Sequence, residues 1–138
     1  ATGLSGALVN ASLWNLTNGT RFFNSRANAP VAVAEVASIP ELQARWALNL
    51  VSLETYQYIA GPAFNAHYTG SLPELWLSVD PVVMDTSLVR LLNDARRAAG
   101  FELLPLVPEF VQYSMELGLG QGYPVERRPG DPAQPVED

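Results

Sequence analysis

The order of apolar and polar residues predicts one long helix in the first half of the chain. Ser38 and Glu41 form a capping box around Pro40, which is the strongest helix start in the sequence. Gly61-Pro62 is a stop signal, because Gly commonly ends helices and Pro cannot continue them. We therefore predict a continuous helix over residues 39–60, the longest in the protein.

The apolar residues of this predicted helix lie in two stripes on opposite sides. One stripe contains Leu42, Trp46, Leu50, Leu53 and Ala60. The other contains Ala44, Ala47, Leu48, Val51, Tyr58 and Ile59. Because a surface helix needs only one apolar stripe, two stripes indicate burial on two sides, either within the domain or against a partner. We expect Trp46 and Leu53 to lie in the core.

The rest of the chain predicts shorter elements. Residues 30–36 read as a short strand, and residues 111–117 alternate apolar and polar side chains with the period of a half-buried strand. A second capping box at residues 71–74 predicts a short helix to about residue 78. Asp85 or Thr86 caps another helix that ends before Gly100, and its polar side carries Arg90, Asn93, Asp94 and Arg97.

The N-terminal segment permits two interpretations. Asn18-Gly19 is a strong signal for a tight hairpin turn, which would place Trp14 opposite Phe23. Alternatively, apolar residues from Val9 to Phe23 repeat at helical spacing. The hairpin is favoured, since Gly inside a helix costs about 1 kcal/mol relative to Ala. The helix stays open as the alternative.

Together these elements predict an α+β fold: one long central helix packed on a small antiparallel sheet, with one or two shorter helices. The length of 138 residues favours a single domain. We place that domain at residues 1–126, with an N-terminal hairpin or helix stub within residues 1–38. Residues 127–138 are rich in Pro and charge and predict a flexible tail.

The composition excludes several classes of function. The net charge of −6 repels phosphate backbones, so we expect no nucleic-acid partner. The chain has no Cys, which excludes disulfides, thiolate metal sites and Cys nucleophiles. Residues 1–20 carry no charge, and we expect them to adjoin a removed hydrophobic segment that would provide any membrane contact. This favours an extracytoplasmic location: periplasmic, cell-surface or secreted.

Few side chains suggest catalysis. His67 is the only histidine, and a site could be assembled from His67, Ser71 or Ser52, and a distant Asp. Glu54, in the middle of the predicted helix, is a separate candidate for an acid or base. The sequence has no nucleophile elbow, no phosphate-binding loop and no His/Glu spacing for a metal. We therefore expect no metal or cofactor, and a catalytic residue is not assigned.

One junction resembles a known family. A predicted helix ending near Tyr58 is followed by Tyr68, Gly70-Ser71, Pro73 and Leu75, which resembles the helix-to-loop transition of type IV pilins and type II secretion pseudopilins. The resemblance implies an exported filament subunit without catalytic activity, whose helix contacts its own sheet and neighbouring subunits. The N-terminal membrane helix of that family is not in this sequence.

These observations lead to two hypotheses on function. The favoured one is a non-enzymatic, exported structural or interaction module, such as a minor pilin or pseudopilin subunit of a surface filament or secretion apparatus. Its partners would be other protein subunits, in a homo- or hetero-oligomer, with interaction residues Trp14, Phe23, Leu48, Val51 and Tyr58. The alternative is a small enzyme or ligand-binding domain around His67.

Overall fold

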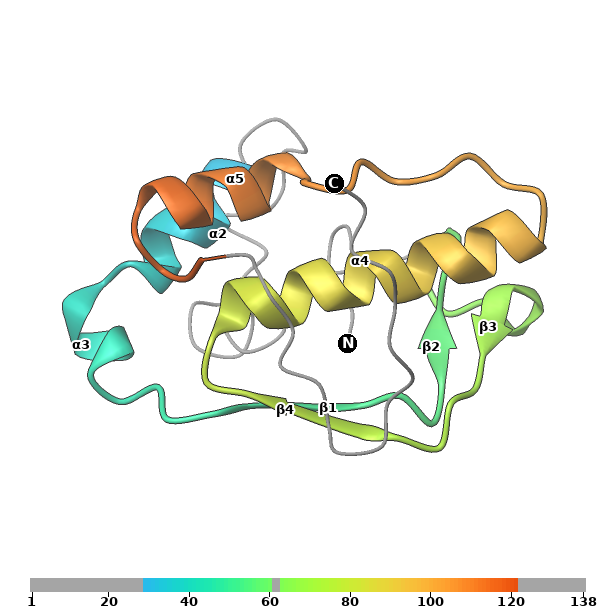
Figure 1. Ribbon diagram of the computed structural model, residues 1–138, viewed down its shortest axis with the longest axis horizontal. Coiled ribbons are helices and arrows are strands. Elements are labelled where there is room, and N and C mark those ends of the chain that lie inside the picture. Colours follow the sequence, from blue (N-terminus) through green and yellow to red (C-terminus); the bar gives the residue numbers. More distant parts are fainter. Residues whose placement is uncertain (1–28, 61–62, 122–138) are drawn as a thin grey trace, which may run out of the picture.

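The computed structural model describes residues 29–60 and 63–121 (Figure 1). The predicted α+β class is confirmed, with helices and short antiparallel strands. The predicted N-terminal hairpin or helix, with Trp14 and Phe23, and the predicted tail at 127–138 lie outside the described residues. The elements, in chain order, are α2 (Ala29–Ala37), α3 (Pro40–Gln43), β1 (Asn49–Ser52), β2 (Tyr56–Gln57), η2 (Ala66–Tyr68), β3 (Thr69–Gly70), β4 (Leu75–Ser78), α4 (Pro81–Ala98) and α5 (Glu109–Glu116).

Helix α4 is the central element of the fold. Helices α2 and α5 pack against each other on one side of α4, and the strands β1 and β4 run along its other side (Figure 1). The short pair β2 and β3 lies towards the C-terminal end of α4 (Figure 1). The long central helix of the predicted fold is therefore present, but it is formed by residues 81–98 and not by residues 39–60.

Each sheet contains two antiparallel strands. In the larger sheet β1 pairs with β4, so that Leu50 lies opposite Leu77 and Val51 opposite Trp76. In the smaller sheet Tyr56 lies opposite Gly70. We call the β1–β4 pair the ribbon. An isolated two-stranded sheet is only marginally stable in water, so the ribbon depends on its packing against α4.

Three apolar clusters hold the layers together. Between the ribbon and α4, the buried side chains of Leu53, Met84 and Leu88 pack with Val51 and Trp76. Leu53 is 1% exposed, which confirms its predicted place in the core. Where α4 begins, the second cluster joins Val82 to Phe110 and Val111. The third surrounds α2 and consists of Val33 and Ala37, with Trp46 packed at its edge.

The predicted helix over residues 39–60 is wrong. Only Pro40–Gln43 is helical, and Ser38 does not cap it, because its hydroxyl donates a hydrogen bond to the Glu35 carbonyl, 2.7 Å away, at the end of α2. From Asn49 onward the chain is extended and pairs with β4. The burial of residues 49–53 alternates in and out, because β4 supplies a partner strand and α4 covers the inner side.

Both predicted strands are helices. Residues 30–36 belong to α2, in which Val33, Ala34 and Ala37 are buried at helical spacing. Residues 111–117 lie largely in α5, where Val111 and Ser114 are buried at the spacing of a helix and not at that of a strand. A segment of seven residues with alternating apolar and polar side chains can also form a helix with one apolar side. The packing of α5 on α2 favours the helix here.

The boundaries of α4 also differ from the prediction. Residues 75–78 of the predicted second helix form strand β4, and α4 starts at Pro81, five residues before Thr86. Asp80 is the N-cap, and its Oδ1 accepts hydrogen bonds from the backbone N–H groups of Val82 (2.8 Å) and Val83 (2.9 Å). The predicted stop is confirmed, since Gly100 has φ +77° directly after the helix.

Candidate functional site

The outer face of the ribbon is apolar and exposed. Successive side chains of a strand point to opposite faces, so the partners Leu50 and Leu77 point away from α4 when Val51 and Trp76 point towards it. Leu50 is 58% exposed and Leu77 is 59% exposed. The same row continues beyond these two residues at both ends. We call the five residues the outer apolar face: Leu48, Leu50, Leu75, Leu77 and Val79.

This face is comparable in size to the largest apolar patch of a typical monomeric protein. All five side chains are about half exposed or more, up to 80% for Val79. Together they expose on the order of 500 Å² of apolar surface, near the upper end of the roughly 300–600 Å² that is found for the largest patch of a typical monomer. No charged residue belongs to the outer apolar face. Contiguous apolar patches of this size often mark interaction sites.

The ribbon that carries the face is held in place by polar contacts on its inner side. Asn49 is 3% exposed; its side-chain oxygen accepts a hydrogen bond from Trp46 Nε1 (2.8 Å), and its Nδ2 donates to the Ser78 carbonyl (3.1 Å). Beyond β1, the Leu53 N–H donates to the Glu74 carbonyl (3.0 Å) and so extends the pairing. The outer apolar face is therefore formed before any partner binds.

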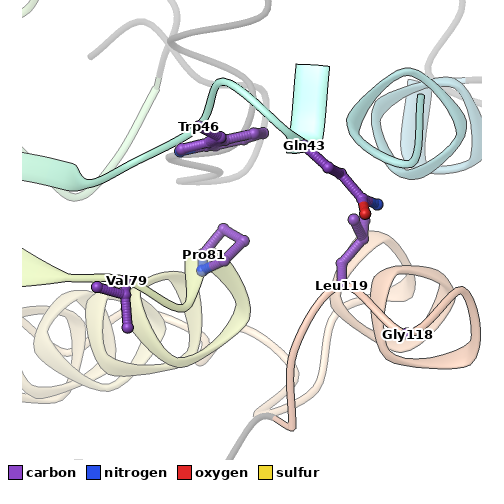
Figure 2. Close-up of a pocket in the computed structure, with 6 residues that line it drawn as sticks. All are labelled: Gln43, Trp46, Val79, Pro81, Gly118 and Leu119. Atoms are coloured by element: carbon purple, nitrogen blue, oxygen red, sulfur yellow. The ribbon is translucent and has the colours of Figure 1, made fainter. Parts of the chain in front are cut away.

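A small pocket adjoins one end of the face. It lies between α3, the start of α4 and the end of α5, with Trp46 above Pro81 and Leu119 turned towards Gln43 (Figure 2). Its volume is about 150 Å³, whereas pockets for drug-sized ligands span roughly 300–1,000 Å³. The lining residues include no acid, base or histidine: Gln43, Trp46, Val79, Pro81, Gly118 and Leu119. Among the described residues, therefore, none that lines the pocket could take part in acid–base chemistry.

The three candidates for a catalytic site do not form one. His67 is exposed in η2, where its backbone N–H donates to Asn65 Oδ1 (3.1 Å). Glu54 lies in the exposed turn between β1 and β2 and not in the middle of a helix, and Ser71 is exposed after β3. Within the described residues no hydrogen bond or ion pair joins these three side chains. In that part of the chain no group of three or more His, Asp or Glu side chains could hold a metal ion.

The candidate interaction residues Leu48, Val51 and Tyr58 lie in three different environments and do not form one surface. Leu48 is 51% exposed and belongs to the outer apolar face. Val51 points inward and packs on the cluster around Leu53. Tyr58 is half-buried beside Tyr68, with ring centroids 6.4 Å apart in an edge-to-face arrangement, and its carbonyl accepts a hydrogen bond from Arg96 Nε (2.8 Å).

Sequence reasoning missed most of the outer apolar face. The helical wheel placed Leu50 on a core stripe, and Leu75 and Leu77 fell in a predicted helix. A usable signal was the period-two pattern of residues 75–79, in which Leu, Leu and Val alternate with Trp and Ser. Because Trp76 is apolar like the Leu and Val residues with which it alternates, the alternation is weak in the sequence. It becomes clear only from the pairing of β4 with β1.

Over the described ranges, no helix combines the length and the apolar character required to cross a lipid bilayer. Comparisons of this chain with protein-family models, with curated proteins and with solved structures found no match.

Proposed function

We propose that this domain acts by binding other protein subunits and not by turning over a substrate. The observation that carries the proposal is the outer apolar face, on which Leu50 and Leu77 stand side by side, more than half exposed, on a ribbon that is already ordered. An ordered surface loses little conformational entropy on binding, which favours its use as a docking site.

The energy available at this face suits a protein partner. Complete burial of a Leu or Val side chain contributes about 1.5–3 kcal/mol, so covering the exposed parts of the five side chains contributes about 4–9 kcal/mol. The loss of translational and rotational freedom on association costs an estimated 4–15 kcal/mol or more. The apolar face alone therefore supports a weak complex, and stronger binding requires polar contacts around its rim.

The alternative, a small enzyme or ligand-binding domain around His67, has no supporting contact among the described residues. His67, Glu54 and Ser71 are exposed, and none of them lines the pocket beside the face.

Assembly into a surface filament or secretion apparatus, outside the cytoplasm, is a narrower form of the proposal. Its support is the resemblance of residues 68–75 to type IV pilins and pseudopilins. The helix that should precede this junction is not formed, because residues 49–52 and 56–57 are strands. The resemblance therefore rests on the loop residues alone, and the narrower form is weaker than the general one.

Site-specific photo-crosslinking in the producing cell tests the general proposal. A photoreactive amino acid replaces Leu50 or Leu77 in the full chain, and the control position is Phe64, which is 75% exposed outside the ribbon. We expect adducts of defined mass from positions 50 and 77 and none of those masses from position 64. The proposal fails if positions 50 and 77 give no adduct, or if all three positions give the same ones.

A further inference from the structure

We propose that a partner protein binds this domain by adding an extended strand to the outer edge of β1. This inference rests on the proposed function and deepens it by naming the mode of recognition. In such a contact the backbone of the partner forms hydrogen bonds with an open sheet edge, and its side chains lie beside those of the existing strands. The occupant is a short extended segment of a different protein.

The register of the ribbon shows which backbone groups of β1 face outward. The N–H of Leu53 donates to the Glu74 carbonyl (3.0 Å), so the backbone of Leu53 is turned towards the β4 side. In antiparallel strands the residues that bond to the partner strand alternate with residues that do not. The backbone of Val51 therefore also faces β4, and the backbones of Leu50 and Ser52 face away from it. The outer edge of β1 thus presents two N–H and two C=O groups.

These four groups have no partner in the part of the chain that the structure describes. No residue of the ranges 29–60 and 63–121 donates to or accepts from the backbone of Leu50 or Ser52. Both residues are exposed. Water can satisfy these groups in the free protein, and a strand can replace that water because its own N–H and C=O groups have the same spacing. The edge is complementary to a polypeptide backbone, which defines the chemistry of the occupant.

The two edges of the ribbon differ in their protection. Proteins commonly block exposed edges with charged residues or Pro, because an open edge invites pairing with other chains. Strand β4 is preceded directly by Pro73-Glu74 and followed closely by Asp80-Pro81. Residues 46–53 around β1 contain neither a charge nor a Pro, and the nearest acid, Glu54, lies in the turn that leads to β2. The edge of β1 is therefore the one that favours strand addition.

The faces of β1 specify the side chains of the partner strand. Side chains of neighbouring strands lie beside each other, so every second residue of the partner would lie next to Leu48 and Leu50 on the outer apolar face. Apolar residues at these positions would cover side chains that are 51% and 58% exposed. The residues between them would lie on the side of Asn49 and Val51. We therefore expect an extended segment about as long as β1, without Pro and with apolar residues at alternate positions.

A different protein is favoured over a second copy or another part of this chain. The net charge of −6 makes two copies repel each other. Among the described elements, α2 and α5 lie on the opposite side of α4 from the ribbon (Figure 1), and β2 and β3 pair with each other. None of these elements supplies the strand. Pairing by a second copy and pairing by another part of this chain are outcomes that the experiments separate.

Substitution of Ser52 separates the edge from the apolar face. Ser52→Pro removes the outward N–H and places a ring where the acceptor of the partner would lie, and Pro is tolerated at edge positions whose N–H faces solvent. The matched control Ser52→Thr keeps the N–H and suits a strand. Both variants carry a photoreactive amino acid at position 77 of the full chain in the producing cell. We expect Ser52→Pro to lower the adduct yield by about tenfold or more and Ser52→Thr to leave it unchanged. Equal yields overturn the inference, and circular dichroism checks that both variants remain folded.

Amide hydrogen exchange provides a second test that does not depend on the folding of Ser52→Pro. The free chain is compared with the purified photo-adduct from position 77. We expect the N–H groups of Leu50 and Ser52 to exchange rapidly in the free chain and about tenfold or more slowly in the adduct, because hydrogen-bonded amides exchange only on opening. The N–H of residue 77, on the edge of β4, should stay fast in both. Slow exchange of Leu50 and Ser52 in the free chain means that another part of this chain already pairs with β1, and fast exchange in the adduct means that the partner binds elsewhere. Either result overturns the inference.

Failure of strand addition and failure of the proposed function are distinguishable. If positions 50 and 77 give no adduct in the cell, both are refuted. If adducts form but persist in Ser52→Pro and leave Leu50 and Ser52 in fast exchange, the domain binds its partner without strand addition and only this inference is refuted. An adduct with the mass of two copies also refutes only this inference, because the occupant is then a second copy.

Discussion

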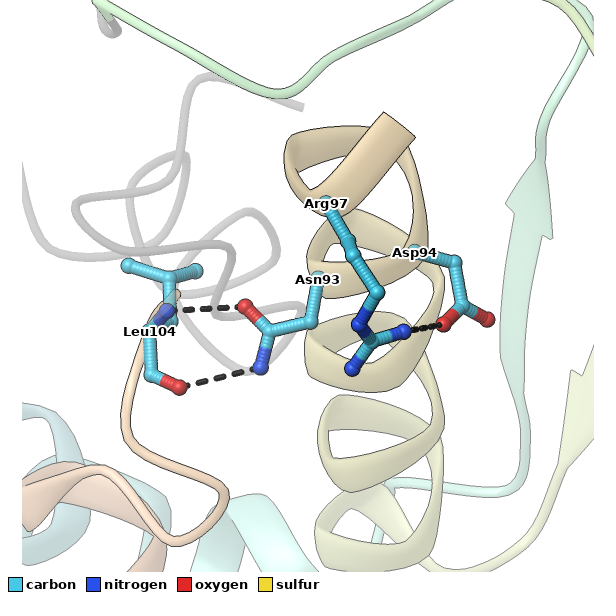
Figure 3. Close-up of polar contacts among 4 residues, drawn as sticks. All are labelled: Asn93, Asp94, Arg97 and Leu104. Carbon is cyan, nitrogen blue, oxygen red and sulfur yellow. Dashed lines mark hydrogen bonds and ion pairs between the residues drawn. The ribbon is translucent and has the colours of Figure 1, made fainter. Parts of the chain in front are cut away.

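Replacement of Asn93 by Ala should destabilise the protein far more than its place on the predicted polar side of α4 implies. The Asn93 side chain is 3% exposed, and both its amide nitrogen and its amide oxygen form hydrogen bonds with the backbone of Leu104 (Figure 3). Its Nδ2 donates to the Leu104 carbonyl (2.9 Å), and its Oδ1 accepts from the Leu104 N–H (2.8 Å). Asn93 thereby ties the irregular segment between α4 and α5 to the central helix.

The magnitude follows from the groups that lose a partner. Each hydrogen bond contributes about 0.5–1.5 kcal/mol net, and a buried group left without a partner costs about 1–3 kcal/mol. The two backbone groups of Leu104 are affected, and Leu104 is only half-buried, so water can replace part of the loss. Ala is also the better helix former by up to about 0.7 kcal/mol. We expect Asn93→Ala to lower the free energy of unfolding by about 2–3 kcal/mol.

Urea unfolding, followed by circular dichroism and by fluorescence of the tryptophans, measures this change. The matched control is Asp94→Ala, one residue further along α4. Asp94 forms an ion pair with Arg97 (2.8 Å; side chains 73% and 64% exposed, Figure 3), and such exposed pairs contribute little. We expect Asp94→Ala to change stability by less than about 0.5 kcal/mol. If Asn93→Ala costs no more than this control, the tie to Leu104 does not contribute to stability and the reasoning is refuted.

Four further predictions concern the core and the ends of α4, each measured by urea unfolding. Leu53→Ala should cost about 2–5 kcal/mol, because it empties a packed site between the ribbon and α4; a cost well below 1 kcal/mol would contradict that packing. Asp80→Ala should cost about 0.5–2 kcal/mol through loss of the N-cap. Gly120→Ala should destabilise the wild-type protein, because the added Cβ meets the Asp80 carboxylate. A double-mutant cycle should show that the cost of Gly120→Ala falls when Asp80 is already replaced by Ala. An equal cost in both backgrounds refutes the contact. Gly100→Ala should cost about 1–2 kcal/mol, since φ is +77° there; an unchanged stability would refute the left-handed stop.

Several features of the protein follow from the sequence itself. The mixture of periods predicts an α+β fold, and the structure confirms it. Gly100 ends a helix in both, because only Gly adopts the left-handed conformation without a steric penalty. Leu53 is buried as predicted, but it packs against α4 from the end of strand β1 and not from the predicted helix. The helix stop at Gly100 depends on one residue, and no distant partner is needed to decide it.

Other features were decided by contacts between distant residues. Residues 49–53 show no regular alternation of polar and apolar residues, and their strand conformation depends on β4, about 25 residues further along the chain, which supplies the hydrogen bonds. Asp85 or Thr86 was the predicted cap of α4, yet Asp80 caps it, and the Oδ2 atom of Asp80 also accepts a hydrogen bond from the Gln121 N–H (3.1 Å). A local pattern states which conformations are possible, whereas pairing and burial determine which one is adopted.

The candidate site belongs wholly to this second group. Leu50 and Leu77 are 27 positions apart and become one surface only through the register of β1 with β4. Their exposure follows from that register, because the helix α4 covers one face of a two-stranded ribbon and nothing in the described chain covers the other. The sequence by itself determined that this protein is rich in apolar residues. Only the tertiary structure decided which of these residues face water, since a strand has two faces and α4 can bury just one.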